Sequence, residues 1–445
     1  MKSTLHLMRI SLVLLLALLI VSCGVRENNG NTTSFPQVSP DRTSNISPIV
    51  VTPNPQAQAS IQNIDQSSTP TCKLTPSKPI ETLTSVRPLD AITFSEPQVV
   101  FIGNIVGIAE WLPDSQMALI STRLLEKEAE SIEILDVSNH NSSQLASHKG
   151  DRTIPLWLES INSVVFVEKL DKNEIVLKVV RPSDANIIVE ASGLLSPYIA
   201  VAPKGRGIIY VDTAGLSKLT TEVGQDSREV VARQEALLAP PSILSAFTRS
   251  VWSPDSQRVL LFNNRGTNSS VFVLDLLTQS VCSFLWSDQT SPTAQDWMVD
   301  AKWSPNGQYL AFVTVRGEVG RLERAVLNIL NIATGIVSPI KMETQYVYEF
   351  EWMPSGTQLL ALGKVEPIHE ITTAGLYFAD IENYTATRVL PNSSFATGIY
   401  GFQGGGLSVA PDGGKVLTIC PDWGNIDPTR SITNTPICLI NITSK

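Results

Sequence analysis

The sequence is poor in histidine and in positive charge. Of its four histidines, His6 lies in an N-terminal segment that we expect to be removed, which leaves His140, His148 and His369 for imidazole chemistry. No histidine or cysteine pair has the spacing of a zinc site, and no Gly-x-Ser-x-Gly motif marks a serine hydrolase. Since 33 basic residues face 42 acidic ones, a net charge of -9, phosphate backbones would be repelled. We therefore expect no nucleic-acid partner, no metal, no cofactor and no catalytic activity.

Long apolar runs are also scarce, and the one that exists is at the N-terminus. Lys2 and Arg9 precede an apolar run over residues 10–21, which has the length of a signal-peptide core and is shorter than the roughly 20 residues of a membrane-spanning helix. The run ends in Ile20-Val21-Ser22-Cys23, which resembles the bacterial lipobox. That resemblance implies that residues 1–22 are a lipoprotein signal peptide and that Cys23 carries the lipid, palmitate or a similar acyl chain. The alternative is an ordinary signal peptide with a chance cysteine.

A lipid at Cys23 would determine where the protein resides. Removal of residues 1–22 leaves 31 basic and 42 acidic residues, a charge of -11, so the lipid rather than electrostatic attraction must hold the chain at a membrane. Two or three acyl chains, at about 0.8 kcal/mol per buried CH2, suffice for this. We expect an exported protein anchored to the cell membrane or the outer membrane and facing the periplasm or the exterior. By the same resemblance, Gly24 favours the outer membrane, if the cell has one.

The segment after the cysteine has few apolar residues. Of the 47 residues from 24 to 70, 29 are Ser, Thr, Asn, Gln or Pro, and Phe35 is the only aromatic. Such a segment buries too little apolar surface to offset the entropy lost on ordering. We expect residues 23–80 to be a flexible tether, of which residues 25–70 pack against nothing, and residues 81–445 to form the folded domain.

A short turn motif recurs along that domain. Five copies are clear: Trp111-Leu112-Pro113-Asp114-Ser115, Trp252-Ser253-Pro254-Asp255-Ser256, Trp303-Ser304-Pro305-Asn306-Gly307, Trp352-Met353-Pro354-Ser355-Gly356 and Val409-Ala410-Pro411-Asp412-Gly413. Two degenerate copies are Trp157-Leu158-Glu159-Ser160 and Val201-Ala202-Pro203-Lys204-Gly205. Counted at the proline position, or at Glu159, the spacings are 46, 44, 51, 51, 49 and 57 residues. A period near fifty that relates seven copies indicates a repeat architecture.

Each copy combines a turn with strands. Proline followed by Asp, Asn or Ser and then Gly or Ser favours a tight turn, so we read Asp114, Asp255 and Asp412 as turn formers rather than as catalytic carboxylates. An apolar run follows each turn, at 117–120, 164–167, 208–211, 259–262, 309–313, 359–362 and 416–419. Runs of this length without alternation are typical of strands covered on both faces. Third and fourth strand signals follow in most copies, so about four antiparallel strands per repeat predict a propeller blade.

The Trp-Ser-Pro-Asp-Gly turn and its following strand resemble the repeat of TolB-like and WD-repeat-like propellers, over about residues 100–445. The resemblance implies an all-β propeller, with seven four-stranded blades expected and six or eight as alternatives. Only 34 residues follow Pro411, too few for a full blade. We therefore expect a strand from residues 80 to 103 to close the last sheet.

Four cysteines remain after Cys23, an even number in an exported protein. They are Cys72, Cys282, Cys420 and Cys438, and they allow three complete pairings. We predict a Cys420–Cys438 disulfide, because these residues end one strand and begin the next in the last repeat. The alternative is two reduced, buried thiols.

We predict that the binding surface lies on the connections between the second and third strands of the later blades. Loops on a rigid scaffold carry much of protein function, and Arg and Trp are enriched in binding hot spots. The candidate residues are Arg316, Arg321, Arg324, His369, Asp422, Trp423, Asp427 and Arg430. We expect a non-catalytic propeller that binds a protein or a cell-envelope component. One alternative is a hydrolase or lyase acting on envelope sugar or peptide with carboxylates around a central channel, and another is a sensory or assembly scaffold.

Overall fold

The computed structural model describes residues 48–51, 71–78, 85–124, 129–149, 154–170, 174–213, 215–224, 230–237, 247–263, 270–284, 297–318, 321–365, 372–397, 406–420 and 435–445. They belong to one unit that spans Ser47–Lys445. Nearly all of their regular structure is β-strand, with three 3-10 turns, η3 (Leu89–Ala91), η4 (Glu159–Ile161) and η6 (Pro203–Gly205). Within these ranges no helix has the length and apolar character needed to cross a membrane.

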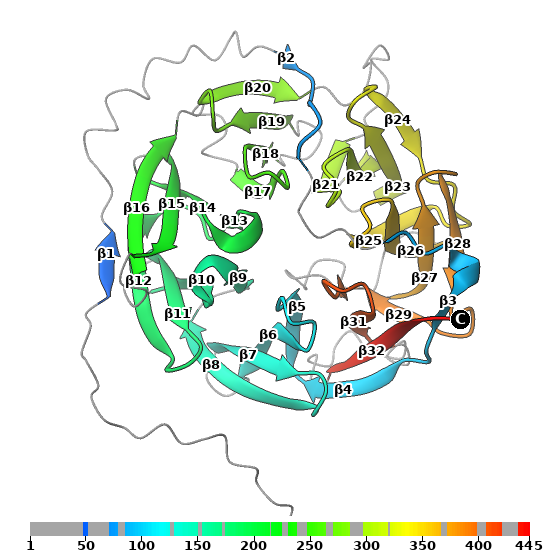
Figure 1. Ribbon diagram of the computed structural model, residues 1–445, viewed down its shortest axis with the longest axis horizontal. Helices are drawn as coiled ribbons and strands as arrows, with labels where there is room; N and C mark the ends of the chain where they lie inside the picture. Colours follow the sequence, from blue (N-terminus) through cyan, green and yellow to red (C-terminus); the bar gives the residue numbers. More distant parts are fainter. Residues whose placement is uncertain are drawn as a thin grey trace, which may run out of the picture. The chain divides into compact units, whose positions relative to one another are not determined.

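The strands follow one another in antiparallel groups, each of which we call a blade (Figure 1). Blade 1 holds β5 (Ile105–Trp111), β6 (Met117–Leu124), β7 (Ala129–Asp136) and β8 (Asn141–Lys149). Blade 2 holds β9 (Leu156–Leu158), β10 (Ser163–Lys169), β11 (Ile175–Arg181) and β12 (Asn186–Leu194). Blade 3 holds β13 (Ala200–Val201), β14 (Ile208–Asp212), β15 (Gly215–Val223) and β16 (Val230–Leu237). The first strand of each blade lies nearest the centre of the unit in Figure 1.

The later blades repeat this order, with a fifth strand in blade 6 and three strands in blade 7. Blade 4 holds β17 (Phe247–Trp252), β18 (Arg258–Asn263), β19 (Ser270–Asp275) and β20 (Ser280–Phe284). Blade 5 holds β21 (Trp297–Trp303), β22 (Tyr309–Glu318), β23 (Arg321–Asn331) and β24 (Ile336–Pro339). Blade 6 holds β25 (Tyr346–Trp352), β26 (Gln358–Lys364), β27 (Thr372–Asp380), β28 (Thr385–Val389) and β29 (Phe395–Thr397). Blade 7 holds β30 (Leu407–Val409), β31 (Lys415–Ile419) and β32 (Thr435–Ser444).

The apolar runs after the turns form the second strands, β6, β10, β14, β18, β22, β26 and β31, as predicted. Their lack of alternation follows from burial on both faces. In β18, Val259 and Leu261 pack in the apolar cluster shared with blade 3, whereas Leu260 and Phe262 pack in the one shared with blade 5. One such cluster fills each joint between successive blades, and a further one joins blade 7 to blade 1. The chain is therefore an all-β propeller.

The predicted closing strand is confirmed. β4 (Gln98–Gly103) pairs antiparallel with β32, and Phe101 lies opposite Ile437. β3 (Ile92–Phe94) pairs with the other end of β32. The last sheet thus joins strands from the two ends of the folded region, and this pairing closes the ring.

The expectation that residues 25–70 pack against nothing is wrong at β1 (Ile49–Val51), and a second part of the expected 23–80 tether, β2 (Thr71–Cys72), is also paired. β1 pairs in parallel with β12 at the outer edge of blade 2. β2 pairs in parallel with β20 at the outer edge of blade 4. A β-branched run such as Ile49–Val51 favours a strand, and an outer strand offers unpaired backbone groups. The expected signal peptide 1–22, Cys23 and the rest of the expected tether up to residue 47 lie outside the described residues.

Candidate functional site

Two ends of the propeller differ in their connections. The motif turns join first to second strands, and we call this side the turn end. Connections from second to third strands lie at the other side, which we call the open end, because antiparallel strands reverse direction at each connection.

At the turn end the predicted turn formers are confirmed. The Asp114 carboxylate accepts hydrogen bonds from the backbone N–H groups of Gln116 (2.9 Å) and Met117 (3.0 Å). Asn306 Oδ1 accepts from the backbone of Gln308 in the same way, at 3.0 Å. These side chains accept hydrogen bonds from the backbone of their own turns, so they stabilise the turn geometry, and the Asp114 carboxylate is engaged in its turn.

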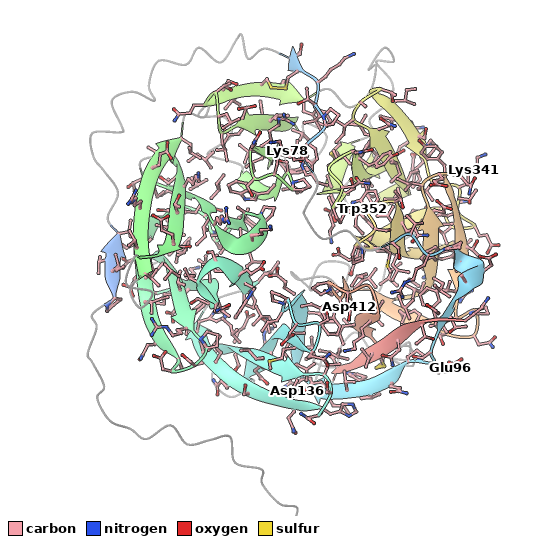
Figure 2. The ribbon with its side chains drawn as sticks, in the orientation of Figure 1. Lys78, Glu96, Asp136, Lys341, Trp352 and Asp412 are labelled. Atoms are coloured by element: carbon pink, nitrogen blue, oxygen red, sulfur yellow. A yellow bond between two sulfur atoms is a disulfide. The ribbon has the colours of Figure 1, made fainter. Side chains whose placement is uncertain are left out.

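The turn end is partly covered by the chain itself. Residues 71–78, which we call the strap, run from the outer edge of blade 4 across its joint with blade 5; Figure 2 labels Lys78 near its end. Ser77 N–H donates to the Gly307 carbonyl at 2.9 Å, and Arg258 Nη1 donates to the Thr75 carbonyl at 2.5 Å. Further along the chain, Gln358 Nε2 donates to the Arg87 carbonyl at 2.7 Å. The chain's own N-terminal part thus contacts blades 4, 5 and 6 at this end.

At the open end, the expectation that Arg316 and Arg324 lie in a loop between the second and third strands is wrong. β22 and β23 continue past the rest of the blade as a two-stranded hairpin, with Arg316 opposite Arg324 and Glu318 opposite Arg321. The sheet ladder continues up to the arginines through Val315, which lies opposite Ala325. Valine and threonine next to the arginines favour extended strands. The side chain of Arg321 lies outside the described residues, as do His369, Asp422, Trp423, Asp427 and Arg430.

The hairpin is braced by its neighbouring blade. Tyr346 on β25 donates its hydroxyl hydrogen to the Glu323 carbonyl at 2.8 Å, and Ala325 N–H donates to the Gln345 carbonyl at 3.0 Å. Arg316 is half-buried and Arg324 is exposed. Directly opposed residues of an antiparallel pair have Cβ atoms about 4.5–5.5 Å apart. The structure therefore places two arginine residues opposite each other on a braced pair of strands at the open end.

Both cysteine pairs are bonded in the structure. Cys420 is joined to Cys438 at the base of blade 7, and Cys72 is joined to Cys282 at the outer edge of blade 4. The second pair places a covalent bond between the strap and β20. The Cys420–Cys438 pairing stays a prediction for chemical mapping.

A charged cluster on the inner strands was missed by the sequence reading. Glu110, Lys302 and Glu351 each directly precede a motif tryptophan, on β5, β21 and β25. The Lys302 ammonium pairs with the Glu351 carboxylate. Glu349, two residues earlier on β25, accepts a hydrogen bond from the Gly406 backbone. The recurrence of a charged residue before tryptophan was the available signal.

Two carboxyls of this cluster have perturbed acidities. Burial raises the pKa of Glu110 to about 7, and the charge of Glu351 adds to that rise, although a 2.8 Å hydrogen bond from Trp157 N–H lowers it. Burial also raises the pKa of Glu349 to about 7 against the lowering effects of Gly406 N–H and Lys302. Carboxyls that change charge near neutral pH are able to give or take a proton in a reaction. Within the described residues, no three His, Cys, Asp or Glu side chains are placed so that they could hold a metal ion together.

No protein-family model matches the sequence, and no curated protein matches it. Solved structures with a similar fold include an oligogalacturonate lyase from Vibrio parahaemolyticus, at 13% identity and a TM-score of 0.48 over 79% of this chain and 97% of that one. TolB from Acinetobacter baumannii is similar at 14% identity and a TM-score of 0.36, over 76% and 78%. The β-propeller domain of the Trilobed protease from Pyrococcus furiosus is similar at 13% identity and a TM-score of 0.43, over 66% and 83%. These likenesses concern the fold.

Proposed function

We propose that this protein is an exported, lipid-anchored propeller that binds a protein or another cell-envelope component through its open end. Cys23 would carry the lipid and hold the protein at the cell membrane or outer membrane. The propeller would contribute a rigid binding surface without chemistry of its own. In this reading its partner is another component of the envelope and not a nucleic acid.

The observation that carries the proposal is the difference between the two ends. At the turn end, the strap and Arg87 already occupy hydrogen-bonding positions on blades 4, 5 and 6. At the open end, the hairpin of β22 and β23 presents Arg316 and Arg324 on a braced support. A binding surface benefits from side chains that are held in place before the partner arrives. Arginine is also among the residues that contribute most at interfaces.

Site-specific photo-crosslinking tests which end is used. A photoreactive residue is placed at Arg324 on the hairpin, and a matched one at Asp114 in an exposed turn of the other end. In intact cells the Arg324 position should give a discrete crosslinked product and the Asp114 position should not. A product from Asp114 alone would mean that the partner binds the turn end.

One observation favours a second candidate function, acid–base catalysis by the inner-strand cluster. Glu110 and Glu349 have pKa values raised to about 7, and Lys302 keeps Glu351 next to them as an ion pair. A hydrolase or lyase acting on sugar or peptide needs one group to donate a proton and another to accept one. The raised pKa values of these two carboxyls meet the first requirement, because they keep a proton available near neutral pH.

The catalytic candidate is tested by assaying envelope polysaccharide and peptide fragments for cleavage. Glu110→Gln and Glu349→Gln keep the hydrogen bonds from Trp157 and Gly406 because the amide oxygen still accepts, but they cannot exchange a proton. Cleavage that these substitutions abolish would establish the enzyme. Cleavage that persists unchanged in both variants would place the chemistry elsewhere or in a contaminant.

A further inference from the structure

The joint between blades 4 and 5 is built differently from three others. Trp352 Nε1 donates to the Lys302 carbonyl at 2.9 Å, Trp111 Nε1 to the Ser408 carbonyl at 3.1 Å, and Trp252 Nε1 to the Ala200 carbonyl at 3.3 Å. In each case the acceptor lies on the inner strand of the adjacent blade, and it is the residue directly before the first residue of that blade's turn motif. By this register Trp303 would donate to Val251. Instead, its buried Nε1 has no partner among the described residues, as is also the case for Trp157 Nε1 at the joint of blades 1 and 2.

The motif turns of blades 4 and 5 are also separated from each other. The turn glycine of blade 6, Gly356, packs directly on Asn306 of blade 5, and a Cβ placed on it would lie 2.8 Å from the Asn306 side chain. Asn306 Nδ2 donates to the Gly356 carbonyl at 3.0 Å. The turn glycine of blade 5, Gly307, meets the strap instead, and a Cβ there would lie 2.6 Å from the Ser77 carbonyl oxygen. The strap therefore takes the position that a neighbouring turn has elsewhere.

The strap contacts both blades of the joint. Leu74 is 6% exposed and belongs to the apolar cluster that holds Phe262 of blade 4 and Trp303 of blade 5. Thr75 accepts a hydrogen bond from Arg258 of blade 4, and Ser77 donates one to Gly307 of blade 5. The strap is thus a wedge with an apolar side chain inside the joint and backbone hydrogen bonds on either side.

The outer end of the wedge depends on one covalent bond. β2 has two residues, paired with Ser283 and Phe284, and so short a strand frays unless it is tied down. Cys72 and Cys282 tie it down. Both are partly exposed, whereas Cys420 and Cys438 are 5% and 1% exposed. Since thiol–disulfide exchange requires access to a sulfur atom, a reductant reaches the strap disulfide more readily.

We propose that the strap is a redox-sensitive latch on the joint between blades 4 and 5. The reductant would be a dithiol. One of its thiolates attacks a sulfur of the Cys72–Cys282 bond to form a mixed disulfide, and its second thiol displaces the remaining cysteine. The dithiol loses two electrons and two protons and becomes a disulfide, while Cys72 and Cys282 become thiols. The strap then frays from blade 4, Leu74 leaves the joint, and β17 and β21 lose protection. The latch does not depend on which end of the propeller binds a partner.

Hydrogen exchange of the full chain tests the latch. The protein is treated with a mild dithiol, and peptide mapping after alkylation verifies which disulfide has opened. Reduction of Cys72–Cys282 alone should speed exchange in β17 and β21 by about tenfold, with β5 and β9 unchanged as internal controls. Unchanged exchange in β17 and β21 after verified reduction would overturn the latch. Faster exchange in every blade, or earlier reduction of Cys420–Cys438, would also overturn it.

Two variants make the same test without a reductant. Cys72→Ser with Cys282→Ser should reproduce the faster exchange of β17 and β21. Leu74→Ala in the oxidised protein should loosen the same strands, because it removes the apolar side chain from the joint. Leu277→Ala, at a position 72% exposed in blade 4, is the matched control and should leave exchange unchanged. If the cysteine variant does not fold, the reduced wild-type protein and Leu74→Ala still show whether the strap protects β17 and β21. Equal exchange rates in these strands for Leu74→Ala and Leu277→Ala would count against the wedge.

Discussion

The indole of Trp352 donates its N–H to the backbone carbonyl of Lys302, 2.9 Å away on the inner strand of the preceding blade. The Lys302 side chain turns back to pair with Glu351, the residue just before Trp352, and its ammonium lies 5.7 Å from the centre of the Phe350 ring. Lys302 is therefore held to β25 through both its backbone and its side chain. Figure 2 labels Trp352 toward the inner part of the ring, where successive blades are closest. A motif recognised as a turn signal thus also links neighbouring blades.

Replacing Trp352 with Phe should destabilise the protein more than the same change at Trp303. Both substitutions remove similar volume from a buried site, but Trp352→Phe leaves the Lys302 carbonyl without its donor, whereas Trp303 Nε1 has no partner to lose. A net hydrogen bond contributes about 1 kcal/mol, so the free energies of unfolding should differ by about that amount. Urea unfolding measures the difference. Equal losses for the two variants would show that the indole bond contributes nothing to the joint.

Raising the pH through neutrality should weaken the fold, and Glu110 and Glu349 should be responsible. Burial raises the pKa of both carboxyls to about 7, above the ordinary 4.5. The folded state then binds more protons than the unfolded state between these values. The stabilisation is therefore complete below about pH 4.5 and is lost as the pH rises through 7. Glu110→Gln and Glu349→Gln should flatten the decline in melting temperature between pH 5 and pH 8, and a decline as steep as that of the wild type would contradict these assignments.

The strap should make Gly307 less tolerant of a side chain than another glycine with the same backbone. Gly307 and Gly335 have φ values of +71° and +72°, so alanine is strained at both, by about 1–2 kcal/mol. Nothing lies within 4 Å of a Cβ at Gly335, but the Ser77 carbonyl blocks the one at Gly307. Gly307→Ala should therefore lower the free energy of unfolding further than Gly335→Ala. Equal decreases in the free energy of unfolding, measured by chemical denaturation, would mean that the strap moves away from the new methyl group without destabilising the protein.

Cys23→Ser should abolish lipid attachment. The serine hydroxyl cannot form the thioether of a lipoprotein, so the variant should remain uncleaved or be released without an acyl chain. Detergent-phase partitioning compares it with wild type, and Cys72→Ser is a control that also removes one cysteine. A Cys23→Ser protein that still partitions into detergent would contradict the lipid anchor.

Much of the fold could be predicted from the turn motif and its period. Proline and the following polar residue determine local turn geometry, and unalternated runs such as Val259–Leu260–Leu261–Phe262 indicate strands buried on both faces, so these features are local in the sequence. The closing strand followed from counting residues after Pro411. The ordering of Ile49–Val51 and of the strap could not be found this way, because their partners on β12 and β20 are far away in the chain.

The candidate site was harder to predict. Arg316 and Arg324 were expected in a loop because they follow the apolar run 309–313, yet the ladder through Val315 and Ala325 extends the strands as far as these arginines. The inner cluster of Glu110, Lys302, Glu349 and Glu351 depends on three strands meeting near the centre of the ring. One unaligned sequence does not show such convergence. The charged residue before three of the motif tryptophans could be seen in the sequence, but the motif was interpreted only as a turn signal.

Partner capture by the hairpin arginines tests the account most directly. The lipid-anchored protein is crosslinked in its native envelope and recovered as wild type, as Arg316→Ala with Arg324→Ala, and as Arg233→Ala, a control arginine that is exposed on β16. Because a true hot-spot residue contributes about 2 kcal/mol or more, the double variant should lose roughly thirtyfold or more of its partner affinity, while the control keeps it and all three proteins stay folded. Full capture by a folded Arg316→Ala, Arg324→Ala protein would contradict binding through the open end.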